Sequence, residues 1–128
     1  MIDHVGITVS DFNKSKRFYS AALAAVKFKL LHDFPASVTG HTDVAGFGEP
    51  PKPEFWIARG TANIPAVHVA CRVASASLVD AFYRAAINAG GRDNGAPGIR
   101  PEYHPNYYGA FVLDPDGHNI EAVCHESG

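Results

Sequence analysis

The stretch Tyr107–His125 reads YYGAFVLDPDGHNIEAVCH and contains two apolar runs joined by the turn DPDG at residues 114–117. Proline presets φ and glycine adopts positive φ readily, so this stretch predicts a β-hairpin. Side chains alternate along a strand, which puts Glu121 on the face opposite Ile120 and Ala122. Because burying an unpaired charge is costly, a carboxylate in the middle of this strand needs a partner.

The chain also contains an internal repeat with an offset of 64 residues (68 − 4 = 64). Placing His4 on His68 aligns residues 4–23 with residues 68–87 without a gap, and seven of the twenty positions are identical. Unrelated segments of ordinary composition would share about one or two. The sequence therefore predicts a duplication. The identical pairs are His4/His68, Val5/Val69, Val9/Val73, Phe18/Phe82, Tyr19/Tyr83, Ala21/Ala85 and Ala22/Ala86.

Each copy is predicted to contain a strand, a helix and then further strands. Residues 1–10 and 66–73 alternate like strands, and each is followed by a helix-face pattern. Asp11 offers an N-cap to the first helix, and Ser75 or Ser77 offers one to the second. Gly90-Gly91 is expected to end the second helix. The remaining expectations are strands near residues 28–31, 41–47 and 54–58, a loop at residues 46–53, and a Gly- and Pro-rich lead into the final hairpin at residues 92–105.

The fold class that follows is α+β, in a single domain spanning residues 1–128. Two βαβββ modules, about residues 1–60 and about residues 64–126, are expected to form a curved mixed sheet around a cavity, with the helices on the outer face. The apolar side chains of the strands face the helices. His4, His68 and Glu121 then share the opposite, cavity-facing side.

Composition limits the classes of function. The chain is 46% hydrophobic and 19% charged, as in ordinary globular proteins, and its net charge of −2 argues against a nucleic-acid or anionic membrane partner. No apolar run approaches the roughly 20 residues of a membrane span, and no signal region begins the chain. Cys71 and Cys124 are expected to be small hydrophobic residues on helix-facing positions. The expected location is the cytoplasm.

Two imidazoles and one carboxylate suit a divalent metal that keeps open positions for substrate or water. A single histidine on a strand more often packs in the core or lies on the surface. However, His4 and His68 are equivalent in the repeat, and Glu121 lies in the middle of a strand. This combination favours a metal site formed by His4, His68 and Glu121.

The segments IDHVGITVSDFNKSKRFYSAAL, AVHVACRV and FVLDPDGHNIEAV together resemble the vicinal oxygen chelate superfamily, which includes glyoxalases, bleomycin resistance proteins and extradiol dioxygenases. The resemblance implies metal ligands at the positions of His4, His68 and Glu121. It also implies one divalent ion (Zn, Ni, Co, Fe or Mn), a small-molecule substrate and a possible homodimer.

The chain also departs from individual members of that superfamily. The repeat offset places Ile57 where glyoxalase I has a second acid. Extradiol dioxygenases carry a histidine before the final hairpin, where His104 stands, but the position of their tyrosine is occupied by Phe111. Fosfomycin transferases share the three-ligand pattern. The favoured function is a metal-dependent, glyoxalase-like lyase or isomerase. The alternatives are a dioxygenase, a thiol transferase, and a metal-free protein that binds a drug or metabolite.

The remaining site predictions concern the segment before the hairpin and two strands. Beside Glu121, His104 and Tyr108 are predicted to be catalytic, as acid or base groups next to a metal-bound oxygen. The predicted substrate-binding residues are Trp56, Arg72, Arg100, Tyr103, Tyr107 and Phe111. No role is assigned to His32, His41, His118 and His125, and His118 is expected to be exposed to solvent.

Overall fold

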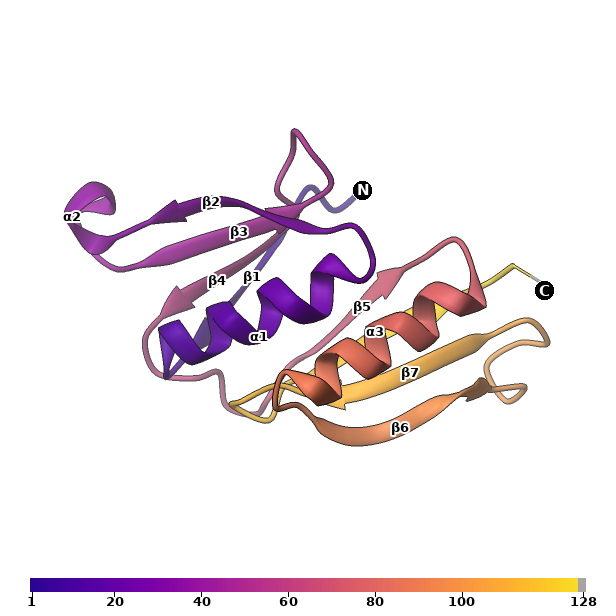
Figure 1. Ribbon diagram of the computed structural model, residues 1–128. Helices are drawn as coiled ribbons and strands as arrows, with labels where there is room; N and C mark the ends of the chain where they lie inside the picture. The colour runs from indigo at the N-terminus through magenta and orange to yellow at the C-terminus, as the bar shows by residue number, and fades with distance from the viewer. Residues whose placement is uncertain (127–128) are drawn as a thin grey trace.

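Each half of the chain folds into a four-stranded mixed sheet with one long helix across one of its faces (Figure 1). The structure is a computed structural model, and it describes residues 1–126. The elements in order are β1 (Val5–Val9), α1 (Phe12–Ala24), β2 (Lys29–Phe34), α2 (Ala36–Thr39), β3 (Val44–Gly48), β4 (Phe55–Arg59), β5 (His68–Arg72), α3 (Ala76–Asn88), β6 (Arg92–Ile99), β7 (Tyr108–Leu113) and β8 (Asn119–Cys124).

The two sheets have the same topology, so the predicted duplication and the α+β class are confirmed. The strand orders are β1-β4-β3-β2 and β5-β8-β7-β6. The first strand of each half pairs in parallel with the last, and the other pairs are antiparallel. β1 and β5 are therefore edge strands of their sheets.

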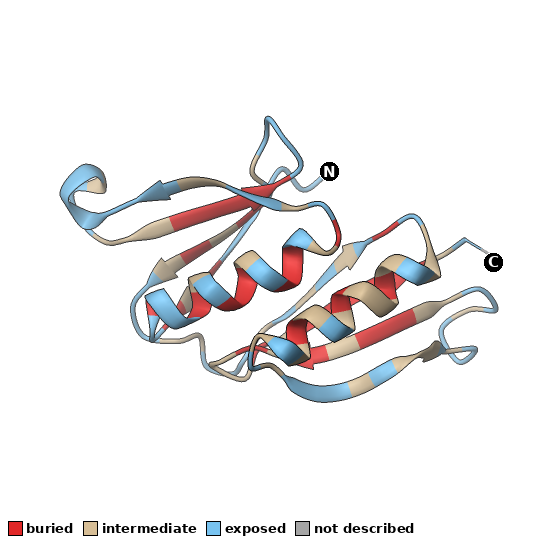
Figure 2. Cartoon of the chain, in the orientation of Figure 1, coloured by how far each residue is buried: buried red, intermediate tan, exposed pale blue. Residues whose placement is uncertain are grey.

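Both long helices begin at the predicted caps. The side chain of Asp11 accepts a hydrogen bond from the backbone N–H of Lys14, and Ser75 accepts one from Leu78. Of the two serines considered for α3, Ser75 is thus the cap. The buried residues follow one stripe of each helix and the strands beneath it (Figure 2). Because α1 and α3 also contact each other, the two modules share one continuous core.

The structure differs from the sequence prediction in the Gly-rich segments. The sequence predicts a loop from residue 46, but Gly46 and Gly48 belong to β3. Residues 92–99, predicted as an irregular lead into the hairpin, form the edge strand β6. The pairing of β6 with β7 shifts register on both sides of Gly95, whose φ is 150°. An edge strand with bulges tolerates Gly and Pro, because it pairs on one side only. This irregularity hides β6 from a search for alternating side chains.

The turn between β7 and β8 joins the two modules. Asp114 accepts a hydrogen bond from the hydroxyl of Tyr19 at 2.5 Å, and Asp116 accepts one from the backbone N–H of Ser10 at 3.0 Å. Both donors lie in the first module. Burial and the negative charge of Asp114 raise the pKa of Tyr19 well above its ordinary value, so its hydroxyl remains a donor.

His118 completes this junction and corrects the expectation that it is exposed, because its exposed fraction is 0%. Its Nδ1 accepts a hydrogen bond from the backbone N–H of Val67 at 3.1 Å. In a neutral ring Nε2 then carries the proton, and it lies 3.2 Å from the carbonyl oxygen of Thr8. The side chain thus connects β1 to the segment before β5.

Candidate metal and ligand site

A buried carboxylate lies on the face of the second sheet that α3 does not cover. The side chain of Glu121 is 1% exposed, and its Oε1 lies 2.8 Å from Nε2 of His68. Its Oε2 accepts a hydrogen bond from the hydroxyl of Tyr107. Burial, this hydrogen bond and the charge of Glu121 raise the pKa of Tyr107 above its ordinary range. Glu121 therefore has the partner that its place in the strand requires.

These residues line a pocket of about 340 Å³. Its other lining residues, Tyr103 and Phe111, were predicted to bind substrate, and the ring of Tyr103 packs edge-on against Tyr107 at 4.8 Å. The ring of Phe111 lies 6.2 Å from that of His68. The pocket therefore combines aromatic walls with one ionisable pair.

His4 is oriented by its neighbour in sequence. Its Nδ1 lies 2.7 Å from a carboxylate oxygen of Asp3, which only accepts hydrogen bonds, so Nδ1 carries the proton. Hydrogen bonds from His4 and Lys52 hold the pKa of Asp3 below its ordinary value. The lone pair of the His4 ring then lies on Nε2. A histidine that binds a metal usually donates its other N–H in this way, and sequence reasoning missed Asp3 although it directly precedes His4.

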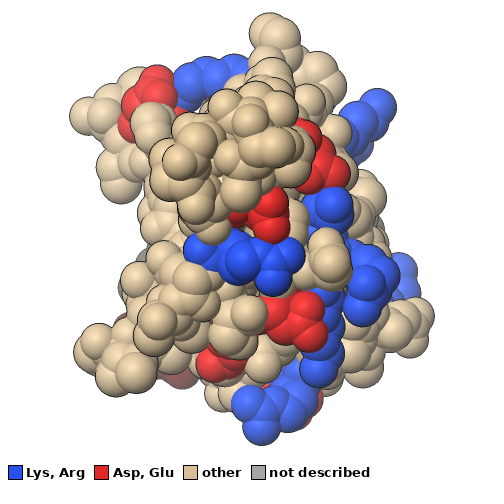
Figure 3. All heavy atoms as spheres, turned by 90° about the vertical axis from the view of Figure 1, so that its left-hand side faces the viewer, with Lys and Arg blue, Asp and Glu red and all other residues tan. Residues whose placement is uncertain are grey.

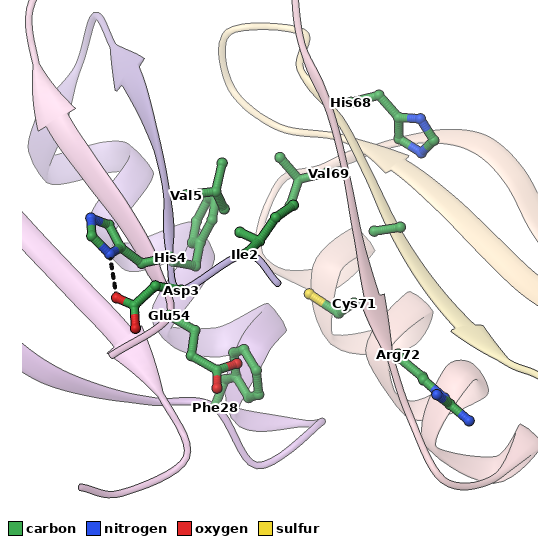
Figure 4. Close-up of a pocket in the computed structure, with 12 residues that line it drawn as sticks. Ile2, Asp3, His4, Val5, Phe28, Glu54, His68, Val69, Cys71 and Arg72 are labelled. Carbon is green, nitrogen blue, oxygen red and sulfur yellow. Dashed lines mark hydrogen bonds and ion pairs between the residues drawn. The ribbon is translucent and has the colours of Figure 1, made fainter. Parts of the chain in front are cut away.

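The structure does not bring His4 to the His68–Glu121 pair within one chain. Both histidines line a cleft of about 480 Å³ between β1 and β5, but their side chains point away from each other (Figure 4). Val5 and Val69 lie between them (Figure 4). Within residues 1–126, the three predicted ligands do not form a group with donor atoms within 4.8 Å of one another. The predicted site is thus divided into two halves on separate sheets.

The register of the parallel pairs corrects the position equivalent to Glu121. Gly6 pairs with Trp56 in the first module, and Ala70 pairs with Glu121 in the second. Gly6 and Ala70 are 64 residues apart, so Trp56 is the structural equivalent of Glu121, with an offset of 65 (121 − 56 = 65). Ile57, which the sequence offset selected, is buried in the core. The first module therefore carries an indole where the second carries a carboxylate.

The two other residues predicted to be catalytic differ in their position. Tyr108 donates a hydrogen bond to Asp80 of α3 at 2.6 Å, on the helix-covered face of the sheet, and is not brought to Glu121. His104 contacts His125 through their ring nitrogens, and its ring lies 5.6 Å from that of Tyr107. His104 thus lies beside the pocket wall. Among the described residues, no hydrogen bond joins it to Glu121.

The two arginines predicted to bind substrate differ in their surroundings. The guanidinium of Arg100 lies 5.5 Å from the ring centroid of Phe111 and donates to the carbonyl oxygen of Ala96. It is therefore next to the pocket of Glu121. Arg72 lines the cleft between β1 and β5, as does Cys71. Burial and nearby carboxylates raise the pKa of the Cys71 thiol to about 11, so this residue is a neutral thiol at physiological pH.

Asp114, Asp116 and His118 also place donor atoms within 4.8 Å of one another. Both ring nitrogens of His118 are, however, already engaged with backbone groups, and the carboxylates accept hydrogen bonds from Tyr19 and Ser10. A metal ion there would have to displace the contacts that join the modules. This cluster is therefore a structural junction.

Charges of opposite sign are interspersed on the face shown in Figure 3. Among the described residues, ion pairs join Lys16 to Asp33 at 2.8 Å and Arg59 to Asp43 at 2.7 Å. Such a face lacks the continuous basic field of nucleic-acid-binding surfaces. None of the helices within residues 1–126 is both long and apolar enough to cross a membrane.

Comparison with known proteins identifies the family of the chain. The family model of the Glyoxalase/Bleomycin resistance protein/Dioxygenase superfamily matches residues 1–122. The chain belongs to this superfamily, and the resemblance seen in its sequence is confirmed. No curated protein matches the chain in sequence.

Several solved structures share the fold. A glyoxalase/bleomycin resistance protein from Albidiferax ferrireducens is 26% identical with a TM-score of 0.76, over 95% of this chain and 97% of that one. A glyoxalase I variant from Zea mays is 23% identical with a TM-score of 0.71, over 95% of this chain and 46% of that one. The fosfomycin resistance protein FosX from Listeria monocytogenes, complexed with Mn(II) and sulfate, is 15% identical with a TM-score of 0.67, over 97% of this chain and 91% of that one.

Proposed function

We propose that the protein is a metal-dependent enzyme of the glyoxalase type, a lyase or isomerase acting on a small molecule with two adjacent oxygens. One divalent ion would be held by His68 and Glu121 of one chain and His4 of a second copy. When bound, such an ion acts as a Lewis acid toward the substrate oxygens. The observation that carries the proposal is the 2.8 Å separation of His68 Nε2 and Glu121 Oε1 on an open sheet face.

The donor atoms fit a metal ion. With metal–ligand distances of about 2.0–2.2 Å, two neighbouring ligands of one ion lie about 3 Å apart in an octahedral site and about 3.4 Å apart in a tetrahedral one. The separation of 2.8 Å between His68 and Glu121 is close to the octahedral value. Tyr107 holds the second oxygen of Glu121, which leaves Oε1 directed at the histidine. Asp3 similarly orients His4 through Nδ1, so that Nε2 is the ring nitrogen free to bind a metal.

A second copy supplies what one chain lacks. His4 is half-exposed, with 57% of its side chain accessible, and lies on a different sheet from Glu121. The helix-free face of the first sheet also exposes an apolar side chain, Phe34, at 38%. In a two-fold dimer the same surfaces meet twice, so two equivalent sites would form. Superfamily membership is consistent with such a dimer.

Coexpressing two variants that each lack one metal ligand tests the shared site. His4→Ala and His68→Ala should each lose tight metal binding, measured as metal per chain by elemental analysis after dialysis against a transition metal salt. When the two variants are coexpressed, half of the dimers are mixed, and each mixed dimer contains one intact site. Metal content should therefore return to about one quarter of the wild-type value, as random pairing of a two-fold dimer requires.

A matched control is His41→Ala, since His41 is exposed and distant in sequence from all three ligands. It should bind metal like the wild type. No recovery in the coexpressed variants would reject the shared site. Wild-type protein that takes up no metal would reject the enzyme and favour the metal-free binding protein.

A further inference from the structure

The helix-free face of the first sheet carries an aromatic row next to His4. Gly6, Trp56, Gly46 and His32 are neighbours across the four strands, since Trp56 pairs with both glycines and Gly46 pairs with His32. Directly paired residues place their side chains on the same face of a sheet. Phe55 and Ile57, on either side of Trp56, are buried in the core, so Trp56 faces away from the helices.

The indole of Trp56 lies over Gly46. A Cβ atom built at Gly46 would be 2.9 Å from three atoms of the six-membered ring, so only glycine leaves room for this position. The ring of His32 is parallel to the indole within 3°, with a centroid distance of 5.9 Å. Phe34 continues the row with a centroid 5.2 Å from that of His32. The indole thus lies between the backbone of Gly46 and the ring of His32, which in turn stacks on Phe34.

On the other side of β4 the sheet surface next to Trp56 is open. Gly6 has no side chain, and a Cβ atom built there would have only the Cβ and the backbone oxygen of Trp56 within 4 Å, both at 3.9 Å. A cleft of about 370 Å³ opens at this position, between Trp56 and His4. Its remaining lining residues are uncharged: Gly6, Ile7, Thr8, Val44, Ile57 and Ala58. The cleft therefore offers a flat apolar surface beside one candidate metal ligand.

We propose that the substrate carries a planar aromatic ring, which stacks on Trp56 while its adjacent oxygens lie toward His4. This assignment rests on the proposed function for the position of the oxygens, but the ring site itself needs no metal. An aromatic ring gains from offset stacking on an indole beyond the area it buries, and a saturated ring of the same size does not. The free surface over Gly6 and the neutral lining favour a small uncharged ring.

Trp56 is the only tryptophan of the chain, so its emission reports directly on this cleft. The probes are catechol and cis-1,2-cyclohexanediol, which share two adjacent hydroxyls and differ in ring planarity. In chelator-treated full-length protein, catechol should quench or shift the emission, excited at 295 nm, and bind about tenfold more tightly than the saturated diol, which corresponds to 1.4 kcal/mol. Affinities are measured in parallel by ligand-observed NMR.

Variants separate the ring site from the fold and from the metal. Trp56→Ala should remove the catechol preference, and Trp56→Phe, which keeps a ring, should retain most of it. Gly46→Ala should displace the indole and weaken catechol binding while circular dichroism stays unchanged. Equal affinities for the two diols in wild-type protein, or an unchanged preference in Trp56→Ala, would overturn the ring site. If wild-type protein binds no metal but still binds catechol more tightly than the saturated diol, only the proposed enzyme is rejected.

Discussion

Nε2 of His68 lies 2.8 Å from Oε1 of Glu121, and the same carboxylate is held on its other oxygen by the hydroxyl of Tyr107. A buried carboxylate is stable only with such partners. One of them, the imidazole, can exchange its contact for a metal bond, whereas the tyrosine can keep its hydrogen bond when a metal is present. The pair is thus both a stable arrangement and a candidate half of a metal site.

Tyr107→Phe should weaken metal binding by about 10- to 100-fold without abolishing it, because the hydroxyl orients a ligand and is not one itself. Glu121→Gln should have a larger effect, since it removes a charged ligand. Isothermal titration with Zn(II) or Mn(II) measures both. The control is Tyr103→Phe, whose hydroxyl makes no hydrogen bond within residues 1–126 and whose removal should leave the affinity unchanged. Equal losses in the two tyrosine variants would contradict the positioning role.

Tyr19→Phe should lower the free energy of unfolding by about 1–3 kcal/mol at pH 7, because Asp114 loses its buried donor. The effect depends on pH. The pKa of Tyr19 is raised in the folded state, so its contribution is complete below the ordinary tyrosine pKa of about 10 and is lost as pH rises above that value. Urea unfolding from pH 7 to pH 11 should show the gap between wild type and variant narrowing above about pH 10.

The matched control is Tyr83→Phe in α3, at the repeat-equivalent position. Its hydroxyl donates to Asp93 at 3.0 Å in an exposed setting, so its loss should change the free energy of unfolding by less than about 1 kcal/mol. A gap between wild type and Tyr19→Phe that stays constant up to pH 11 would show that the buried hydroxyl does not resist ionisation.

His118→Ala should destabilise the protein by about 2–5 kcal/mol, because it leaves a cavity and removes the partners of two backbone groups, Val67 N–H and Thr8 C=O. The measurement is urea unfolding followed by circular dichroism and by Trp56 emission, which reports on the first module. A wild-type midpoint in His118→Ala would disprove its role in the junction. His41→Ala, at an exposed position, should stay within about 0.5 kcal/mol of wild type.

Much of the fold was readable from local pattern. The matching positions around His4 and His68 revealed the duplication, and the caps at Asp11 and Ser75 marked the helix starts. Alternation around Glu121 also placed its side chain on the correct face. β6 was missed because its bulges break the period of two on which such a prediction relies. His118 was misplaced because a histidine after a turn has no local sign of burial.

The sequence alone determined the two modules and the faces of their strands, because side-chain alternation and helical spacing depend on neighbours in the chain. It also indicated the superfamily, through the resemblance of three of its segments. Only the tertiary structure decided that Trp56, rather than Ile57, is equivalent to Glu121, since pairing register is a contact between distant segments. It also decided that His4 and His68 point away from each other in one chain. The contacts that join the two modules, among them the packing of α1 on α3 and the junction at His118, connect distant segments and have no counterpart in any local pattern.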